Sequence, residues 1–196
     1  MVINLKFLQK NSFLKQISYK LAKRRAQRVV THIKQYLRSS DRILDIGAGT
    51  CTKCEILHEE NHEVTPIDIK NLSLVDSIKP IIYNGQKLPF KKNQFNVTLL
   101  LFILHHTPRP KKILAEATRV SKRIIIIEDI HTNIIHKYLT YFFDSFINQE
   151  FRGHPHSNKT DKQWKVLFNQ LGLKLKDAKY KRHYLILKHA IYSLEK

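Results

Sequence analysis

A glycine-rich turn between two carboxylates is the part of the sequence that most clearly carries chemistry. Asp45 lies in an apolar run that leads directly into Gly47-Ala48-Gly49, and Asp68 ends a second apolar run 23 positions after Asp45. Glycines let a backbone approach a ligand closely, and a carboxylate at a strand tip can accept both hydroxyls of a ribose. The pattern therefore predicts a nucleoside-cofactor site on an open parallel sheet.

The turn differs from the dinucleotide-binding fingerprint. That fingerprint needs a third glycine three residues after the second, where this chain has Thr52. The carboxylate of Asp45 also suits a cationic ligand better than a pyrophosphate. The residues thus favour a nucleoside cofactor that carries a positive charge.

Further motifs follow the turn in a characteristic order. They are Asn84 to Phe90, Phe95-Asn96-Val97, Leu104-His105-His106, Glu116 with Arg119-Val120, and Ile124 to Glu128. With the turn, this succession resembles the class I S-adenosylmethionine-dependent methyltransferases, and most closely their small-molecule and quinone-biosynthesis branch. The resemblance covers residues 40 to 130 and continues more weakly to the end of the chain.

The resemblance implies S-adenosylmethionine as the cofactor, bound at the carboxyl ends of the first four strands. It places Asp45 against the methionine ammonium and Asp68 against the ribose hydroxyls. The remaining implied contacts are with the backbone of Gly47, Ala48 and Gly49, with Ile69, Asn84 and Gly85 around the adenine, and with Leu101 on the methionine side. Leu101 is equally compatible with a place in the core.

Two residues depart from the family pattern. Asn84 stands where relatives usually have an aspartate that binds the adenine amino group, and we expect its amide oxygen to accept that bond more weakly. Cys51 replaces the family's usual third glycine, so the loop after Gly49 could differ in shape.

Candidate catalytic residues follow the fourth and fifth expected strands. His106, His105 and Glu128 would lie where an acceptor meets the methyl group, and a histidine there can act as a base near neutral pH. The alternatives are that one histidine orients the loop while the other is packed. Asp129 could cap a following helix instead of serving the site.

We expect no metal site. His154 and His156 form a pair without a clear third ligand, although His131 or His136 could add one. Cys51 and Cys54 are too few for a four-cysteine zinc site, and we interpret them as residues at a helix start, with a redox pair as the alternative. A reducing cytoplasm is the simplest compartment, because we also find neither an 18-residue apolar run nor a signal-peptide pattern.

Apolar periodicity predicts the elements that position these residues. Helices are expected at 5–38, 51–60, 71–77, 108–121, 133–148 and 161–171, and strands at 42–46, 63–68, 80–83, 96–102, 123–128, 173–180 and 183–192. Alternating strands and helices favour an α/β, Rossmann-like, doubly wound sheet. The resemblance implies seven mostly parallel strands, an antiparallel C-terminal strand and an N-terminal helical lid.

We therefore expect one methyltransferase domain over residues 1–196. It would comprise basic N-terminal helices (1–40), a cofactor-binding core (41–130), a substrate-side helix and loop (131–160), and a closing helix and hairpin (161–196). The N-terminal helices could serve as a lid, cover the sheet only, or contact a membrane.

Positive charge is concentrated in the two flanks of the chain. Residues 1–42 hold 11 Lys and Arg against one acid, and residues 152–196 hold 11 against three, whereas the core is nearly neutral. Basic flanks could contact nucleic acid or an anionic membrane surface, which would make the protein peripheral at the membrane. The alternative is that codon drift in an AT-rich genome produced the excess of basic residues without a function.

Three functions remain open at this point. The first is methyl transfer from S-adenosylmethionine to a small apolar or aromatic acceptor, by O- or C-methylation. The second is an RNA-directed methyltransferase that uses the basic flanks, although His105-His106-Thr107-Pro108 is not the Asn/Asp-Pro-Pro-aromatic run expected of base methylation. The third is a non-catalytic S-adenosylmethionine-binding protein.

Overall fold

A seven-stranded sheet forms the centre of the computed structural model, which describes residues 12–131, 159–183 and 187–196. The strand order is β3-β2-β1-β4-β5-β7-β6. The strands are β1 (Arg42–Ile46), β2 (Glu63–Asp68), β3 (Ile81–Ile82), β4 (Phe95–Leu101), β5 (Ser121–Ile130), β6 (Lys174–His183) and β7 (Leu187–Glu195). Strands β1 to β5 pair in parallel, and β7 pairs antiparallel with both β5 and β6. The predicted fold class is confirmed.

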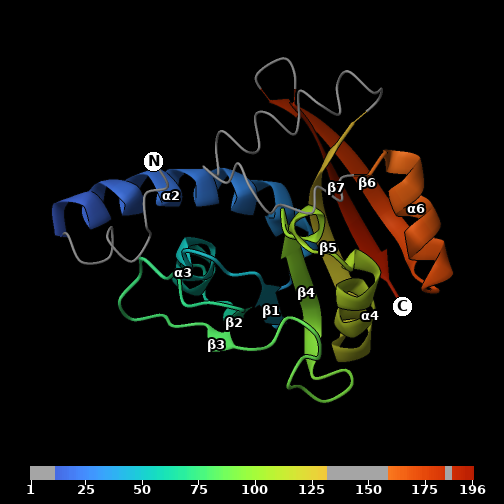
Figure 1. Ribbon diagram of the computed structural model, residues 1–196, viewed down its shortest axis with the longest axis horizontal. Helices are drawn as coiled ribbons and strands as arrows, with labels where there is room; N and C mark the ends of the chain where they lie inside the picture. The colour runs from blue at the N-terminus through green and yellow to red at the C-terminus, as the bar shows by residue number, and fades with distance from the viewer. Residues whose placement is uncertain (1–11, 132–158, 184–186) are drawn as a thin grey trace.

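Helices cover both faces of this sheet (Figure 1). They are α2 (Ser12–Ile33), α3 (Thr52–Glu59), α4 (Pro110–Val120) and α6 (Asp161–Gln170). Alternate residues of β4 and β5 point to opposite sides, as the pleat requires. Leu99 and Ile125 join the hydrophobic core with α2 and α3, whereas Leu100 and Ile126 join the core with α4 and α6.

The short helix expected at 71–77 does not form. In its place, the Asn71 side chain accepts the Ser73 N–H, and the Ser73 hydroxyl donates to the Val75 carbonyl. These side chains offer the backbone hydrogen bonds that compete with a helix. The other expected elements within the described residues form within a few residues of their predicted bounds.

The closing helix α6 begins and ends as its sequence suggests. Thr160 caps it with a capping box that includes Gln163, and Gly172 follows its end with φ +69°. The helix expected at 133–148 and the loop at 149–158 lie outside the described residues. Across the parts of the chain that the structure describes, no helix is both long enough and apolar enough to span a bilayer.

Candidate cofactor and acceptor site

The glycine turn occupies the carboxyl end of β1, between β2 and β4. Gly47 and Gly49 adopt φ of +74° and +55°, which side chains rarely adopt. A Cβ on Gly47 would lie 2.5 Å from Cγ2 of Ile103, so only glycine fits beneath that side chain. The turn is anchored by the N–H groups of Gly47 and Ala48, which both donate to the Ile67 carbonyl of β2.

Cys51 adopts a backbone conformation typical of glycine, the residue that the family usually has at this position. Its φ is +59°, in the left-handed region, and it precedes the first residue of α3. A side chain in this conformation stores backbone strain. Cys51 and Cys54 are both buried and free, and burial raises both thiol pKa values. The alternative of an acidified redox pair is therefore disfavoured.

Asp45 is fully buried at the end of β1. Its Oδ2 accepts a bond from the Cys54 thiol at 3.3 Å and lies 3.6 Å from Nζ of Lys53. Its Oδ1 has no hydrogen-bond partner among the described residues. Burial raises the carboxyl pKa, and the Lys53 ammonium opposes that shift only in part. The buried oxygen is thus suited to a further cation or hydrogen-bond donor.

Asp68 organises the loops around the glycine turn. Its Oδ2 accepts the Gly49 N–H at 2.8 Å, and its Oδ1 accepts the N–H groups of Ile69 and Lys70 at 2.6 and 3.3 Å. The carboxylate is therefore held by three backbone donors from two loops. An ionised carboxylate has about four acceptor positions, so one remains for a ligand hydroxyl.

The loop after β3 forms the adjacent wall. Gly85 has φ +72°, and an added Cβ would lie 3.3 Å from Cγ2 of Ile69, whose side chain is 55% exposed. The exposed Ile69 side chain beside the Gly85 backbone offers an apolar contact for a nucleobase such as adenine.

Asn84 differs from the expectation in one important way. Its Oδ1 already accepts the N–H groups of Gln86 and Lys87, at 3.0 and 3.3 Å. An amide oxygen has two lone pairs, so both are occupied and the exposed edge of the side chain is its NH2 group. Asn84 therefore offers a donor where the usual aspartate offers an acceptor.

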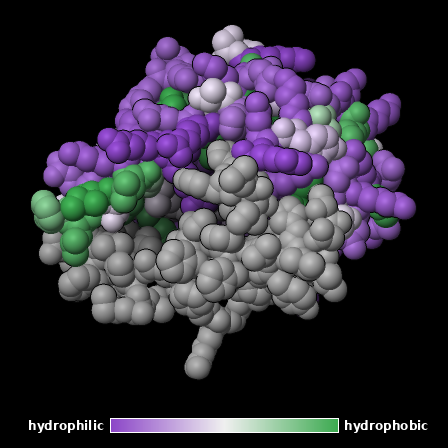
Figure 2. Space-filling model, turned by 90° about the horizontal axis from the view of Figure 1, so that it is seen from above, coloured by the Kyte–Doolittle hydropathy of each residue, from purple (hydrophilic) through white to green (hydrophobic). Residues whose placement is uncertain are grey.

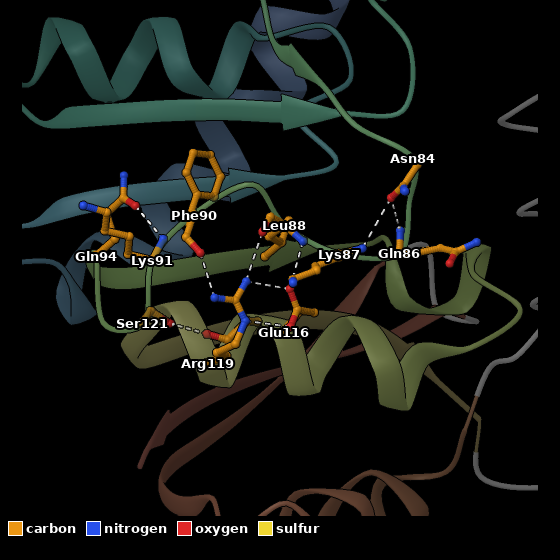
Figure 3. Close-up of polar contacts among 11 residues, drawn as sticks. Asn84, Gln86, Lys87, Leu88, Phe90, Lys91, Gln94, Glu116, Arg119 and Ser121 are labelled. Carbon is orange, nitrogen blue, oxygen red and sulfur yellow. Dashed lines mark hydrogen bonds and ion pairs between the residues drawn. The ribbon is translucent and has the colours of Figure 1, made fainter.

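A half-buried ion pair on α4 holds this loop in place (Figure 3). Arg119 donates to the carbonyls of Phe90 and Leu88 at 2.7 and 3.0 Å, and Glu116 accepts the Leu88 N–H at 2.8 Å. The two side chains also pair with each other at 2.7 Å. Arg119 lowers the Glu116 pKa, so the carboxylate stays ionised as an acceptor. Glu116 and Arg119 belong to a motif of the family resemblance, but the sequence did not indicate that they hold this loop.

The segment after β4 is where the sequence predicts the acceptor side of the site. Leu101 is buried in the core with α2 and α3, and the half-buried Ile103 lies against Gly47 of the turn. Between them, Phe102 has φ +60°, a conformation that non-glycine residues adopt rarely. Neither Phe102 nor Ile103 was identified from sequence, because an apolar residue after a strand gives no signal of this geometry.

His105 and Glu128 form a buried pair behind that segment. The distance from His105 Nδ1 to Glu128 Oε2 is 2.5 Å, and Glu128 Oε1 accepts the Leu104 N–H at 2.7 Å. Their side chains are 1% and 0% exposed. Both Glu128 oxygens are thus engaged within the protein, and this pair holds the turn after β4. A role of Glu128 as a substrate-facing carboxylate stays a prediction.

His106 is the half-buried member of the histidine pair. Its ring lies 4.0 Å from the His105 ring between centroids, on the short 3₁₀ turn Leu104–His106. Asp129, the proposed helix cap, contacts His189 of β7 at 2.8 Å. His154 and His156 lie outside the described residues, and within those described no metal-binding cluster of histidine, cysteine and carboxylate side chains occurs.

Comparison with known proteins agrees with this geometry. Residues 44–124 match the methyltransferase domain family. The demethylmenaquinone methyltransferase of Renibacterium salmoninarum is 31% identical over 99 residues, which cover 46% of this chain and 42% of that protein. The chain spans about two fifths of the length of the two curated relatives that it matches (42% and 39%).

Solved structures share the fold over most of the chain. An S-adenosylmethionine-dependent methyltransferase from Methanosarcina mazei has a TM-score of 0.64 and 20% identity, over 83% of this chain and 96% of that one. Magnesium protoporphyrin IX methyltransferase from Synechocystis, with bound S-adenosylhomocysteine, has a TM-score of 0.64 and 13% identity, over 95% and 88%. Residues 44–124 thus match a methyltransferase domain, and the chain shares its fold with solved S-adenosylmethionine-dependent methyltransferases.

Proposed function

We propose that the protein binds S-adenosylmethionine and directs methyl transfer to a small apolar or aromatic acceptor, by O- or C-methylation. The observation that carries this proposal is the fully buried Asp45, with one oxygen lacking a partner among the described residues, beside a turn that only glycine fits. A buried carboxylate of this kind gains most from a cationic ligand. The methionine ammonium of the cofactor is such a cation.

The surrounding residues fit the rest of the cofactor. Asp68 retains an acceptor position for the ribose, and Ile69 with Gly85 offers an apolar wall for the adenine. When bound, the cofactor supplies a methyl carbon already activated by its sulfonium charge. The protein then needs chiefly to align the acceptor and exclude water.

His106 is the proposed base. It would take the proton from an acceptor hydroxyl or acidic carbon onto a ring nitrogen. The electron pair left on the acceptor would form the bond to the methyl carbon as the bond from that carbon to sulfur breaks. The proton then passes to solvent. The buried His105–Glu128 pair fixes the turn that carries His106, since Glu128 accepts from both the Leu104 backbone and the His105 ring.

The quinone-biosynthesis relative supports an apolar ring as acceptor, since that protein is named for a menaquinone precursor. A cysteine nucleophile of the kind used in some base methylations has no support among the described residues. Both cysteines are buried beside β1, and their thiol pKa values are raised. A small molecule is therefore favoured over a nucleic-acid base.

Calorimetric titration with S-adenosylmethionine and S-adenosylhomocysteine tests the cofactor part of the proposal. We expect both to bind, and lack of binding by both would refute it. Methyl uptake from labelled cofactor, screened across phenolic and quinol acceptors, tests the acceptor part. Binding without any methyl uptake would favour the non-catalytic alternative.

A further inference from the structure

We infer that the outward face of α2 docks on an anionic lipid surface. The inference does not depend on the identity of the methyl acceptor. Three large hydrophobic side chains remain exposed on α2: Phe13 is 70% exposed, Leu21 61% and Ile17 42%. In Figure 1, α2 begins at the left, beyond α3, and Figure 2 shows a hydrophobic area on that side of the molecule with hydrophilic surface along its upper edge.

The exposed hydrophobic residues share one face of α2 with exposed basic residues. Phe13, Ile17 and Leu21 are spaced four apart, and Lys20, Arg24 and Arg28 follow at the same spacing. At 3.6 residues per turn, these six positions fall within about 100° of arc. The opposite face carries Ala26, Val29, Val30 and Ile33, which are buried against the sheet and α3. The two faces of α2 therefore have different partners.

The charge on the outward face is not neutralised by the protein itself. Lys15 and Lys23, which lie toward the body of the molecule, pair with Asp76, Glu55 and Glu59. Lys20, Arg24 and Arg28 are exposed and have no carboxylate partner among the described residues. Residues 12–40 contain no acidic residue. This face complements a surface of negative charge.

A lipid surface accounts for both properties together. Aliphatic side chains insert between headgroups while neighbouring Lys and Arg meet lipid phosphates, and each basic residue near the surface adds to the attraction. RNA would use the basic residues but gives Ile17 and Leu21 no partner. A second copy of the chain would need roughly 800 Å² per partner for a standard interface, more than three side chains on one helix provide.

Sedimentation of the full chain with vesicles tests the inference. We expect binding to vesicles of phosphatidylcholine and phosphatidylglycerol in equal parts, and at least about tenfold weaker binding to phosphatidylcholine alone. Phe13→Ser with Leu21→Ser should weaken binding to the mixed vesicles about tenfold. Arg24→Gln with Arg28→Gln should weaken it about as much and reduce its dependence on salt.

Matched controls come from other exposed positions. Val166→Ser with Leu175→Ser removes exposed hydrophobic residues elsewhere, and Lys112→Gln with Lys162→Gln removes the same charge from α4 and α6. Both controls should bind as the wild type does. Melting curves check folding, and Ile17→Glu replaces any double variant that does not fold.

Several results would overturn the inference. The first is unchanged vesicle binding by the hydrophobic double variant, and the second is equal binding to neutral vesicles. Capture of polyuridylate without vesicle binding would assign the face to RNA. Loss of a dimer in the hydrophobic variant, without vesicle binding by the wild type, would assign it to a second copy.

Discussion

The two halves of the site are built by different means. The cofactor half, at the ends of β1 and β2, consists of backbone turns shaped by glycines and held by Asp68. The proposed acceptor half, after β4, consists of side chains held by the buried pair that His105 of this turn forms with Glu128 of β5. The first half thus depends on the left-handed backbone of its glycines and on backbone hydrogen bonds to β2, and the second on side-chain contacts with β5. This difference suggests that each half can be disabled without the other.

The largest expected effect is on the acceptor half. His106→Ala should lower turnover about 100-fold or more, the usual contribution of a general base. Cofactor affinity should stay unchanged, because His106 lies outside the cofactor turn. Turnover with an identified acceptor and calorimetry with the cofactor measure the two effects. Normal turnover would remove His106 as the base.

His105→Ala provides the matching comparison. It leaves Glu128 buried without its partner, so we expect a lower melting temperature as well as lower turnover. His106→Ala should melt as the wild type does. Equal melting temperatures for the two variants would show that His105 does not position the segment.

The next effect concerns the cofactor half. Asp68→Ala should weaken S-adenosylmethionine binding about 100-fold, since a hydrogen bond to a charged group contributes roughly 1.5–3 kcal/mol and the Gly49 turn also loses its anchor. Asp68→Asn, which keeps one acceptor oxygen, should lose less. Calorimetric affinities compare the three proteins. Unchanged affinity in Asp68→Ala would contradict our placement of the ribose.

A smaller effect, of opposite sign, is expected at Asn84. Asn84→Asp keeps the oxygen that caps the turn and replaces the exposed NH2 group with an acceptor. We expect about three- to tenfold tighter cofactor binding, from one gained hydrogen bond to the adenine amino group. S-Inosylmethionine, whose base lacks that amino group, serves as the control ligand and should show no gain. A weaker affinity for S-adenosylmethionine would show that the NH2 group already binds the base.

The smallest expected effect is on stability, at Asp45, where one substitution should change stability and cofactor binding in opposite directions. Burial raises the Asp45 pKa in the folded state, so the folded protein binds this proton more readily than the unfolded chain. Asp45 thus lowers stability as pH rises from the unfolded value through the folded one, and it remains destabilising above that. Asp45→Asn should raise the melting temperature by a few degrees at neutral pH while weakening cofactor binding. The gain should shrink in acid, and its persistence there would contradict this cause.

The sequence alone was sufficient for the sheet and for the backbone conformation of the glycine turn. Strand β1 was predicted with its observed bounds, and so was β2, because each is a short apolar run that ends at a turn signal. The glycines at 47 and 49 mark positive φ values for the same local reason. Backbone conformation that depends only on neighbouring residues can therefore be predicted from the sequence.

The tertiary structure alone decided the roles of side chains that meet across the fold. Glu128 and His105 are 23 residues apart, and only the pairing of β4 with β5 brings them together and buries them. The Asn84 side-chain oxygen accepts a hydrogen bond from its own loop, and the residue type alone does not predict this orientation. The exposed face of α2 likewise became visible only once Ala26, Val29, Val30 and Ile33 had taken the buried one. Partner choice depends on residues distant in sequence, which the local pattern of residues does not specify.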